Sequence, residues 1–151
     1  MANKIVLASR SPRRKEILEK LNLKFVIDPP EIDETPRVDE EPTKYVQRIA
    51  AAKADLVALR HDQKDLIIAA DTTVALNGEI FGQPQDIKHA RQMIQKLSGK
   101  THSVLTAVSV RWDGLSANGF DESKVTMREV TRELLEWYLA TGESMGKAGA
   151  Y

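Results

Sequence analysis

The chain begins with a short apolar run that is followed directly by signals for the start of a helix, and this order constrains the fold of the first residues. Residues 5–8 (Ile-Val-Leu-Ala) form a run short enough for a buried strand. Ser11 can cap a helix, and Pro12 suits the first helical position, where no backbone N–H is needed. The chain therefore begins as a strand that leads directly into a helix. Exposed N–H groups and the positive end of the helix dipole favour phosphate oxygens at such a junction.

The first turn of this helix is basic, with Arg13 and Arg14 in adjacent positions. Together with Ser9 at the end of the strand, these residues predict a phosphate-binding segment. A solvated basic turn is the alternative, because basic runs commonly serve only solubility. The segment alone does not decide between the two interpretations.

Helical and extended patterns largely alternate along the rest of the chain. The apolar run at residues 66–70 lacks alternation, as in a strand covered on both faces, and it ends at Asp71. Asn77 and Gly78 form a strong hairpin signal, because both residues tolerate positive φ. A mixed α/β domain, with a sheet flanked by helices, is therefore expected over residues 1–151. Periodicity and cap residues predict helices over 12–21 (with Ile17, Leu18 and Leu21 on one face), 43–60 (with Thr43 as its cap), 86–97 (with Asp86 as its cap) and 131–141, and further strands over 23–27, 104–112 and near 125–127.

Composition limits the classes of protein to which the chain can belong. At 151 residues it fits one domain, and its 22 basic and 22 acidic residues balance, so that no overall charge draws it to nucleic acid or to an anionic membrane. The absence of cysteine excludes a disulfide framework and is compatible with a reducing compartment. No stretch approaches the ~18 apolar residues of a membrane span. These features predict a soluble, cytoplasmic protein.

Two predicted strand ends bring polar side chains to one edge of the sheet. In open α/β sheets, ligands bind beyond the carboxyl ends of the strands. The basic segment at residues 9–14 follows one strand and Asp71 follows another. Basic side chains offset phosphate charge, while a carboxylate holds a divalent cation or takes a proton from an attacking water. Asp71 is therefore the best single candidate for catalysis, and a turn aspartate that caps backbone N–H groups is its alternative role.

Other polar side chains carry weaker signals. Lys53 lies on a predicted helix, where a lysine usually covers apolar surface with its stem and keeps its charge in solvent. Glu34 belongs to an acidic stretch that could supply a second metal ligand or could be a solvated loop. The three histidines lack the spacing of a zinc site, and the P-loop and G-x-S-x-G motifs are absent. P-loop proteins and serine hydrolases of that kind are thereby excluded, and the sequence argues against a zinc site.

Four segments, in this order and spacing, closely resemble the Maf family of nucleotide pyrophosphatases. They are residues 9–14, 70–72, 97–104 and 141–151, and the resemblance covers essentially the whole chain. It implies an ITPase-like (Maf/Ham1) α/β fold, a divalent metal cation (Mg²⁺ or Mn²⁺), and hydrolysis of a nucleoside triphosphate to the monophosphate and pyrophosphate. It also suggests a homodimer.

The resemblance implies a role for each residue that stands at a matching family position. Asp71 looks like the family's catalytic carboxylate, the general base for the water that attacks the α-phosphorus, and also like a metal ligand. Glu34 matches an acidic position near the metal. Arg13 and Thr72 are similar to the residues of the branch that acts on dTTP and UTP, so that this branch is expected. The positions that line the triphosphate are matched by Ser9, Arg14, Lys53 and Lys147.

The chain departs from the family pattern in two places. Gln83 stands where the family usually has a lysine, so that a neutral amide replaces one positive charge beside the phosphates. The chain ends at Tyr151, inside a family segment, and the closing strands and final helix of the family are expected to be missing. A nucleotide-binding remnant with weak catalysis is therefore one alternative. A cell-division regulator that contacts nucleic acid through Arg13 and Arg14 is another, disfavoured by the balanced charge and the aromatic content of 5%.

Overall fold

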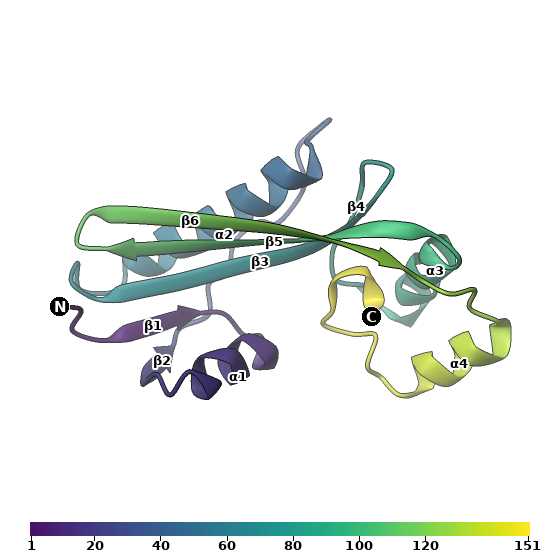
Figure 1. Ribbon diagram of the computed structural model, residues 1–151, viewed down its shortest axis with the longest axis horizontal. Helices are drawn as coiled ribbons and strands as arrows, with labels where there is room; N and C mark the ends of the chain where they lie inside the picture. The colour runs from purple at the N-terminus through teal and green to yellow at the C-terminus, as the bar shows by residue number, and fades with distance from the viewer. The chain divides into compact units, whose positions relative to one another are not determined.

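Strands and helices alternate for most of the chain in the computed structural model, which describes residues 1–151 (Figure 1). The predicted mixed α/β fold is confirmed. None of the helices combines the length and the apolar character that crossing a membrane requires. The strands are β1 (Ile5–Ala8), β2 (Phe25–Ile27), β3 (Leu66–Leu76), β4 (Glu79–Phe81), β5 (Thr101–Trp112) and β6 (Leu115–Thr126). The helices are α1 (Pro12–Lys20), α2 (Pro42–Ala58), α3 (Ile87–Leu97), α4 (Arg132–Ala140) and the short 3₁₀ helix η1 (Ala148–Ala150).

The strands are hydrogen-bonded in the order β2-β1-β3-β5-β6, and β4 pairs with β3 outside this path. Strand β1 is parallel to both β2 and β3, with Ala8 opposite Ala69, whereas β3 and β4 are antiparallel. The chain divides into two compact units, and each is described by itself. The first contains residues 1–71 and 106–120, and the second contains residues 72–105 and 121–151.

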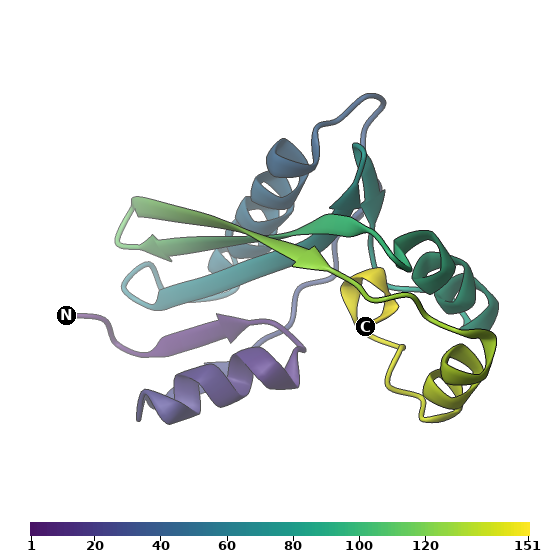
Figure 2. The ribbon, with the colours of Figure 1, turned by 45° about the vertical axis from the view of Figure 1, so that its right-hand side comes forward.

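In the first unit, helices α1 and α2 cover opposite faces of the strands. The chain moves from β1 to β2 in one direction across the sheet, and from β2 past β1 to β3 in the other. Right-handed crossovers in opposite directions place their helices on opposite faces, and Figure 2 shows α1 and α2 in these positions. Such a reversal is where open α/β sheets bind their ligands. The core between α2 and the strands contains the buried side chains of Val6, Ala8, Ala54, Val57, Ile67 and Ala69.

An acidic loop, residues 28–41, connects β2 to α2 and is attached to that helix. Arg48 of α2 donates two hydrogen bonds to the Glu40 carboxylate, at 2.6 and 2.7 Å. The hydroxyl group of the buried Tyr45 donates to the backbone carbonyl of Glu34 at 2.8 Å. Because a bidentate pair fixes direction as well as distance, helix α2 determines where the loop and Glu34 lie.

In the second unit, the C-terminal segment packs against the core that α3 and α4 cover. Gly149 of η1 has φ of +70°, and a Cβ atom at this position would lie 2.9 Å from Cγ2 of Val74. The Tyr138 hydroxyl donates to the carbonyl oxygen of Ala150 at 3.1 Å. Only glycine meets both the backbone conformation and the close approach at position 149.

Strand β3 is longer than the sequence predicts. The predicted strand ends at Asp71, but β3 continues through Asp71 to Leu76. The pairing with β1 stops at Ala69 because β1 ends at Ala8, and further along β3 pairs with β4. The polar side chains at 71–73 therefore mark the end of one strand pairing and not the end of the strand.

Two sequence predictions differ from the structure, one for the buried face of α1 and one for the extent of β6. Ile17 and Leu21 of α1 are 58% and 62% exposed, so that only Leu18 of the predicted apolar face is buried. Strand β6 begins at Leu115, well before the predicted 125–127, and its side chains are almost all exposed. An edge strand of this kind is held by backbone hydrogen bonds and carries no alternating pattern for sequence analysis to detect.

Helix caps are predicted correctly in one case of three. Ser11 stands at the N-cap of α1, but its side chain makes no capping hydrogen bond. Helix α2 begins at Pro42, so that Thr43 lies inside the helix and does not cap it. Asp86 is confirmed as the cap of α3, since its carboxylate accepts a hydrogen bond from the backbone N–H of His89 at 2.6 Å.

We expect Gly149→Ala to destabilise the protein more than Gly146→Ala. Both glycines have positive φ, +70° and +73°, but a Cβ atom at position 146 has nothing within 4 Å. The left-handed backbone alone costs an alanine about 1–2 kcal/mol, and the contact with Val74 adds about 1–3 kcal/mol of overpacking at position 149. Urea denaturation of both variants measures the difference, and equal losses would show that Val74 can move away freely.

We expect the contribution of the Arg48–Glu40 pair to stability to disappear in acid. The hydrogen bonds from Arg48 lower the pKa of Glu40 from 4.5 to about 2, and a lowered carboxyl pKa stabilises the fold above the unfolded value. The difference in free energy of unfolding between the wild type and Arg48→Met should therefore shrink as pH falls from 4.5 towards 2. Urea denaturation at a series of pH values measures it. Arg48→Met should have a much smaller effect in the Glu40→Gln background, and an unchanged effect would contradict this assignment.

Candidate functional site

The reversal between β1 and β3 brings two predicted site residues to the same end of the sheet. Ser9 follows β1 directly, and Asp71 lies two residues beyond Ala69, the partner of Ala8. Both residues are only 6% exposed. Arg14 links the two strands, because its Nη1 atom donates to Ser9 Oγ at 3.2 Å and to the carbonyl oxygen of the residue before Asp71 at 2.9 Å. The two separate sequence signals therefore belong to one site.

Ser9 organises the start of helix α1. Its Oγ accepts one hydrogen bond from the backbone N–H of Ser11, at 3.1 Å, in addition to the bond from Arg14. The helix begins with Pro12, and no acidic residue occupies its first turn. The positive end of this helix is therefore not neutralised by its own side chains, which favours an anion there.

Arg14 and Arg13 lie in different electrostatic surroundings. Burial lowers the pKa of Arg14, and the neighbouring Arg13 lowers it further, while the charges of Asp71 and Glu34 raise it. Arg13 itself is exposed. An anion placed beside both guanidinium groups would offset their mutual repulsion, and a guanidinium held away from bulk water binds phosphate oxygens strongly.

The centre of the site is a lysine between two carboxylates. Nζ of Lys53 lies 2.8 Å from Oδ1 of Asp71 and 2.7 Å from Oε1 of Glu34. The side chains of Lys53 and Asp71 are 12% and 9% exposed, whereas that of Glu34 is 49% exposed. Helix α2, the acidic loop and strand β3 each supply one of the three groups. Three residues that the sequence analysis named on separate elements thus meet at one point.

The surroundings of Asp71 favour a carboxylate that accepts a proton. Burial raises the pKa of Asp71, and the nearby Glu34 adds to this, while Lys53 and Arg14 oppose it. A carboxylate with a raised pKa is a stronger base than a solvated one. Burial together with the charges of Asp71 and Glu34 raises the pKa of Tyr45, so that its hydroxyl stays neutral and donates to the acidic loop.

Tyr45 and Arg48 belong to the site although no sequence prediction included them. Tyr45 lies within the helix predicted over residues 43–60, and its hydroxyl group is the one local signal, because a buried tyrosine usually finds a partner for that group. The position of Arg48 opposite Glu40 follows from the path of the acidic loop, and nothing in the local sequence indicates it.

The oxygen donors fit a divalent cation that arrives with a phosphate. Glu34 and Asp71 direct carboxylate oxygens at the same positive centre, which Lys53 supplies in this structure. No group of three or more histidine, cysteine, aspartate and glutamate side chains could hold a metal. Mg²⁺ is usually bound through one or two carboxylates together with substrate phosphates and water, and dedicated all-protein cages are less common. The two carboxylates match this kind of site.

Three predicted residues belong to the second unit. Thr72 is half-buried on β3, and because strand side chains alternate it faces the side opposite to Asp71. Gln83 is exposed just after β4, and Lys147 is half-buried just before η1. The backbone N–H of Gly149 donates to the carbonyl oxygen of Gly82 at 3.1 Å, so that the segments of Gln83 and Lys147 are neighbours within this unit.

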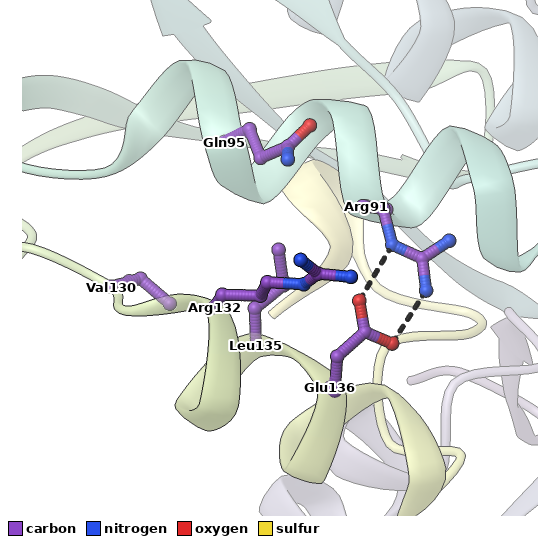
Figure 3. A pocket seen from close by; sticks show the side chains of 6 residues that line it. All are labelled: Arg91, Gln95, Val130, Arg132, Leu135 and Glu136. Atoms are coloured by element: carbon purple, nitrogen blue, oxygen red, sulfur yellow. Dashed lines mark hydrogen bonds and ion pairs between the residues drawn. The ribbon is translucent and has the colours of Figure 1, made fainter.

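The second unit also has a groove between α3 and α4 that contains none of the predicted residues (Figure 3). Arg91 donates two hydrogen bonds to the Glu136 carboxylate across it, at 3.0 and 2.6 Å. The pair neutralises both charges and ties the two helices together. Its lining residues are Arg91, Gln95, Val130, Arg132, Leu135 and Glu136.

Two solved structures show a similar fold. A nucleoside-triphosphatase / dITP/XTP pyrophosphatase from Mycobacterium abscessus superimposes with a TM-score of 0.55, at 17% identity, over 82% of this chain and 73% of that one. The Ham1 protein of Staphylococcus aureus gives a TM-score of 0.54, at 15% identity, over 81% of this chain and 69% of that one. The expected ITPase-like (Maf/Ham1) fold is therefore confirmed.

Sequence comparison gives the family. The dTTP/UTP pyrophosphatase of Methylococcus capsulatus is 42% identical over 98% of this chain and 73% of its own length. Those of Pyrococcus furiosus and of Anaeromyxobacter dehalogenans strain 2CP-1 are 43% and 46% identical, over 98% and 100% of this chain and 77% of their own lengths. The family described as Maf-like protein matches residues 4–151. The chain therefore belongs to the Maf-like protein family.

Proposed function

We propose that this protein is a nucleoside triphosphate pyrophosphatase that converts dTTP and UTP to the nucleoside monophosphate and pyrophosphate. The observation that carries the proposal is the buried Asp71 carboxylate beside Lys53 and Arg14, at the reversal point of the sheet. The relatives from Methylococcus, Pyrococcus and Anaeromyxobacter are named as dTTP/UTP pyrophosphatases, which supports this substrate class.

Asp71 acts as the general base in the proposed reaction. A water molecule loses its proton to the Asp71 carboxylate as its oxygen attacks the α-phosphorus. The bond from the α-phosphorus to the bridging oxygen breaks, and pyrophosphate leaves. The raised pKa of Asp71 suits this role, because a base is most effective when its pKa lies near the working pH.

Positive side chains hold the triphosphate and offset the charge that develops on it. Arg14 and Ser9 form one side of the anion site at the start of α1, and Lys53 reaches it from α2. The resemblance adds Gln83 and Lys147 as triphosphate contacts. Glu34 and Asp71 would hold Mg²⁺ or Mn²⁺, which when bound neutralises phosphate charge and polarises the reacting phosphoryl group.

Two further proposals follow the resemblance: Arg13 and Thr72 select pyrimidine nucleotides, and the protein acts as a homodimer. A cytoplasmic location is proposed from the composition, because the chain has no cysteine.

We expect Asp71→Asn to lose about 10²–10⁴-fold in kcat, the usual contribution of a general base. The assay incubates the wild type with dTTP or UTP and Mg²⁺ or Mn²⁺ and measures pyrophosphate directly. Asp39→Asn is the matched control, because Asp39 is exposed in the acidic loop and asparagine tolerates its φ of 53°. Release of orthophosphate, or full activity of Asp71→Asn, would overturn the mechanism. Nucleotide binding without turnover by the wild type would instead favour the weakly catalytic remnant.

We expect Arg13→Met to lower kcat/KM for dTTP and UTP by about tenfold or more, as for the loss of a hydrogen bond to a charged group. Because Arg13 is proposed to select the substrate, kcat/KM for purine nucleotides should change less. Lys15→Met is the control, since Lys15 is exposed on the same helix and pairs only with Glu19 at 3.6 Å. An equal loss for every nucleotide would assign Arg13 to phosphate binding alone.

A further inference from the structure

The ammonium group of Lys53 occupies the place between the two proposed metal ligands. Its Nζ atom is 2.8 Å from Asp71 and 2.7 Å from Glu34, and its side chain is 12% exposed. In the free protein, Lys53 thus offsets part of the negative charge of both carboxylates. A cation from solution has to compete for the two carboxylates with the Lys53 ammonium group, which is part of the chain itself.

A divalent cation cannot share this position with the ammonium group. Mg²⁺ binds carboxylate oxygens at about 2.1 Å, so that an ion between Glu34 and Asp71 would stand next to Lys53 Nζ. Like charges at such separations repel strongly where the dielectric is low. An ion can therefore take up Oδ1 of Asp71 and Oε1 of Glu34 only after Lys53 has left these two atoms.

The backbone segments that carry the two carboxylates are held without Lys53. Asp71 is part of strand β3, and Glu34 belongs to the loop that Tyr45 and Arg48 attach to α2. Removal of the lysine charge would therefore leave the backbones of Asp71 and Glu34 in place, with both carboxylates within reach of one ion. A site freed in this way would attract a cation without any nucleotide.

We propose that Lys53 is an internal counter-ion that keeps divalent cations off Asp71 and Glu34 until a triphosphate draws its ammonium group away. This inference rests on the proposed function, which identifies the anion as a nucleoside triphosphate. A metal ion alone offers Lys53 no new partner, whereas the oxygens of a triphosphate do. Metal and nucleotide should then each strengthen the binding of the other, by the same factor.

Mn²⁺ binding in the absence of nucleotide tests the proposal, with electron paramagnetic resonance as the readout. Lys53→Met should bind Mn²⁺ about tenfold more tightly than the wild type, or more, within the usual range of coupling between two sites. Lys4→Met is the matched control. It removes the same charge from a single buried carboxylate, Asp65, 3.3 Å away, at the opposite end of β1, and should leave Mn²⁺ affinity unchanged.

Two further variants separate charge from shape. Lys53→Arg keeps the charge and should bind Mn²⁺ as weakly as the wild type. Lys53→Gln removes the charge but keeps a hydrogen-bond donor, the side-chain amide. If Lys53→Met does not fold, Lys53→Gln should show the same gain in Mn²⁺ affinity. A Mn²⁺ affinity equal to or below that of the wild type in the neutral variants would overturn the proposal.

The α,β-methylene analogue of dTTP, which cannot be cleaved to pyrophosphate, supplies the second arm. It should tighten Mn²⁺ binding to the wild type more than to the neutral variant. Equal tightening in both would also overturn the proposal. If the wild type hydrolyses dTTP and the neutral variants show no gain, the counter-ion role fails while the proposed function stands. If the wild type releases no pyrophosphate from dTTP, the proposed function fails whatever the Mn²⁺ result.

Discussion

The parallel pairing of β1 with β3 is the interaction on which the site depends. It sets Ala8 opposite Ala69 and thereby brings Ser9 and Asp71 to the same end of the sheet. The crossover to β2 runs the other way, so that α1 and α2 approach this end from opposite faces. A shift of the pairing register by one residue would move Asp71 to the other side of the sheet.

Charge is concentrated at this end and is balanced locally. Two acidic groups face Lys53, and the half-buried Arg14 adds a second cation. Such a cluster loses much of its hydration on folding, and it persists because each charge has a partner of opposite sign. A site assembled in this way is already complementary to a ligand that carries phosphate anions and a metal cation together.

The acidic loop shows how distant residues control the same cluster. Glu34 is half exposed and would be mobile on an unattached loop, but Tyr45 and Arg48 fix the backbone around it. Both residues lie on α2, which also carries Lys53. One helix thus carries Lys53 and positions the loop that holds Glu34, so that the geometry of the site follows the packing of α2 on the strands.

The sequence by itself determined the order of strands and helices, the junction of β1 with α1, the hairpin at Asn77 and Gly78, and the identity of the charged candidates. These features depend on neighbouring residues and on short-range periodicity, which a single sequence displays. Only the tertiary structure decided that Lys53 lies between Glu34 and Asp71, that β3 continues past Asp71, and that β6 forms an exposed edge. Those outcomes depend on contacts between segments far apart in the chain and on backbone pairing, and neither leaves a periodic trace in the local sequence.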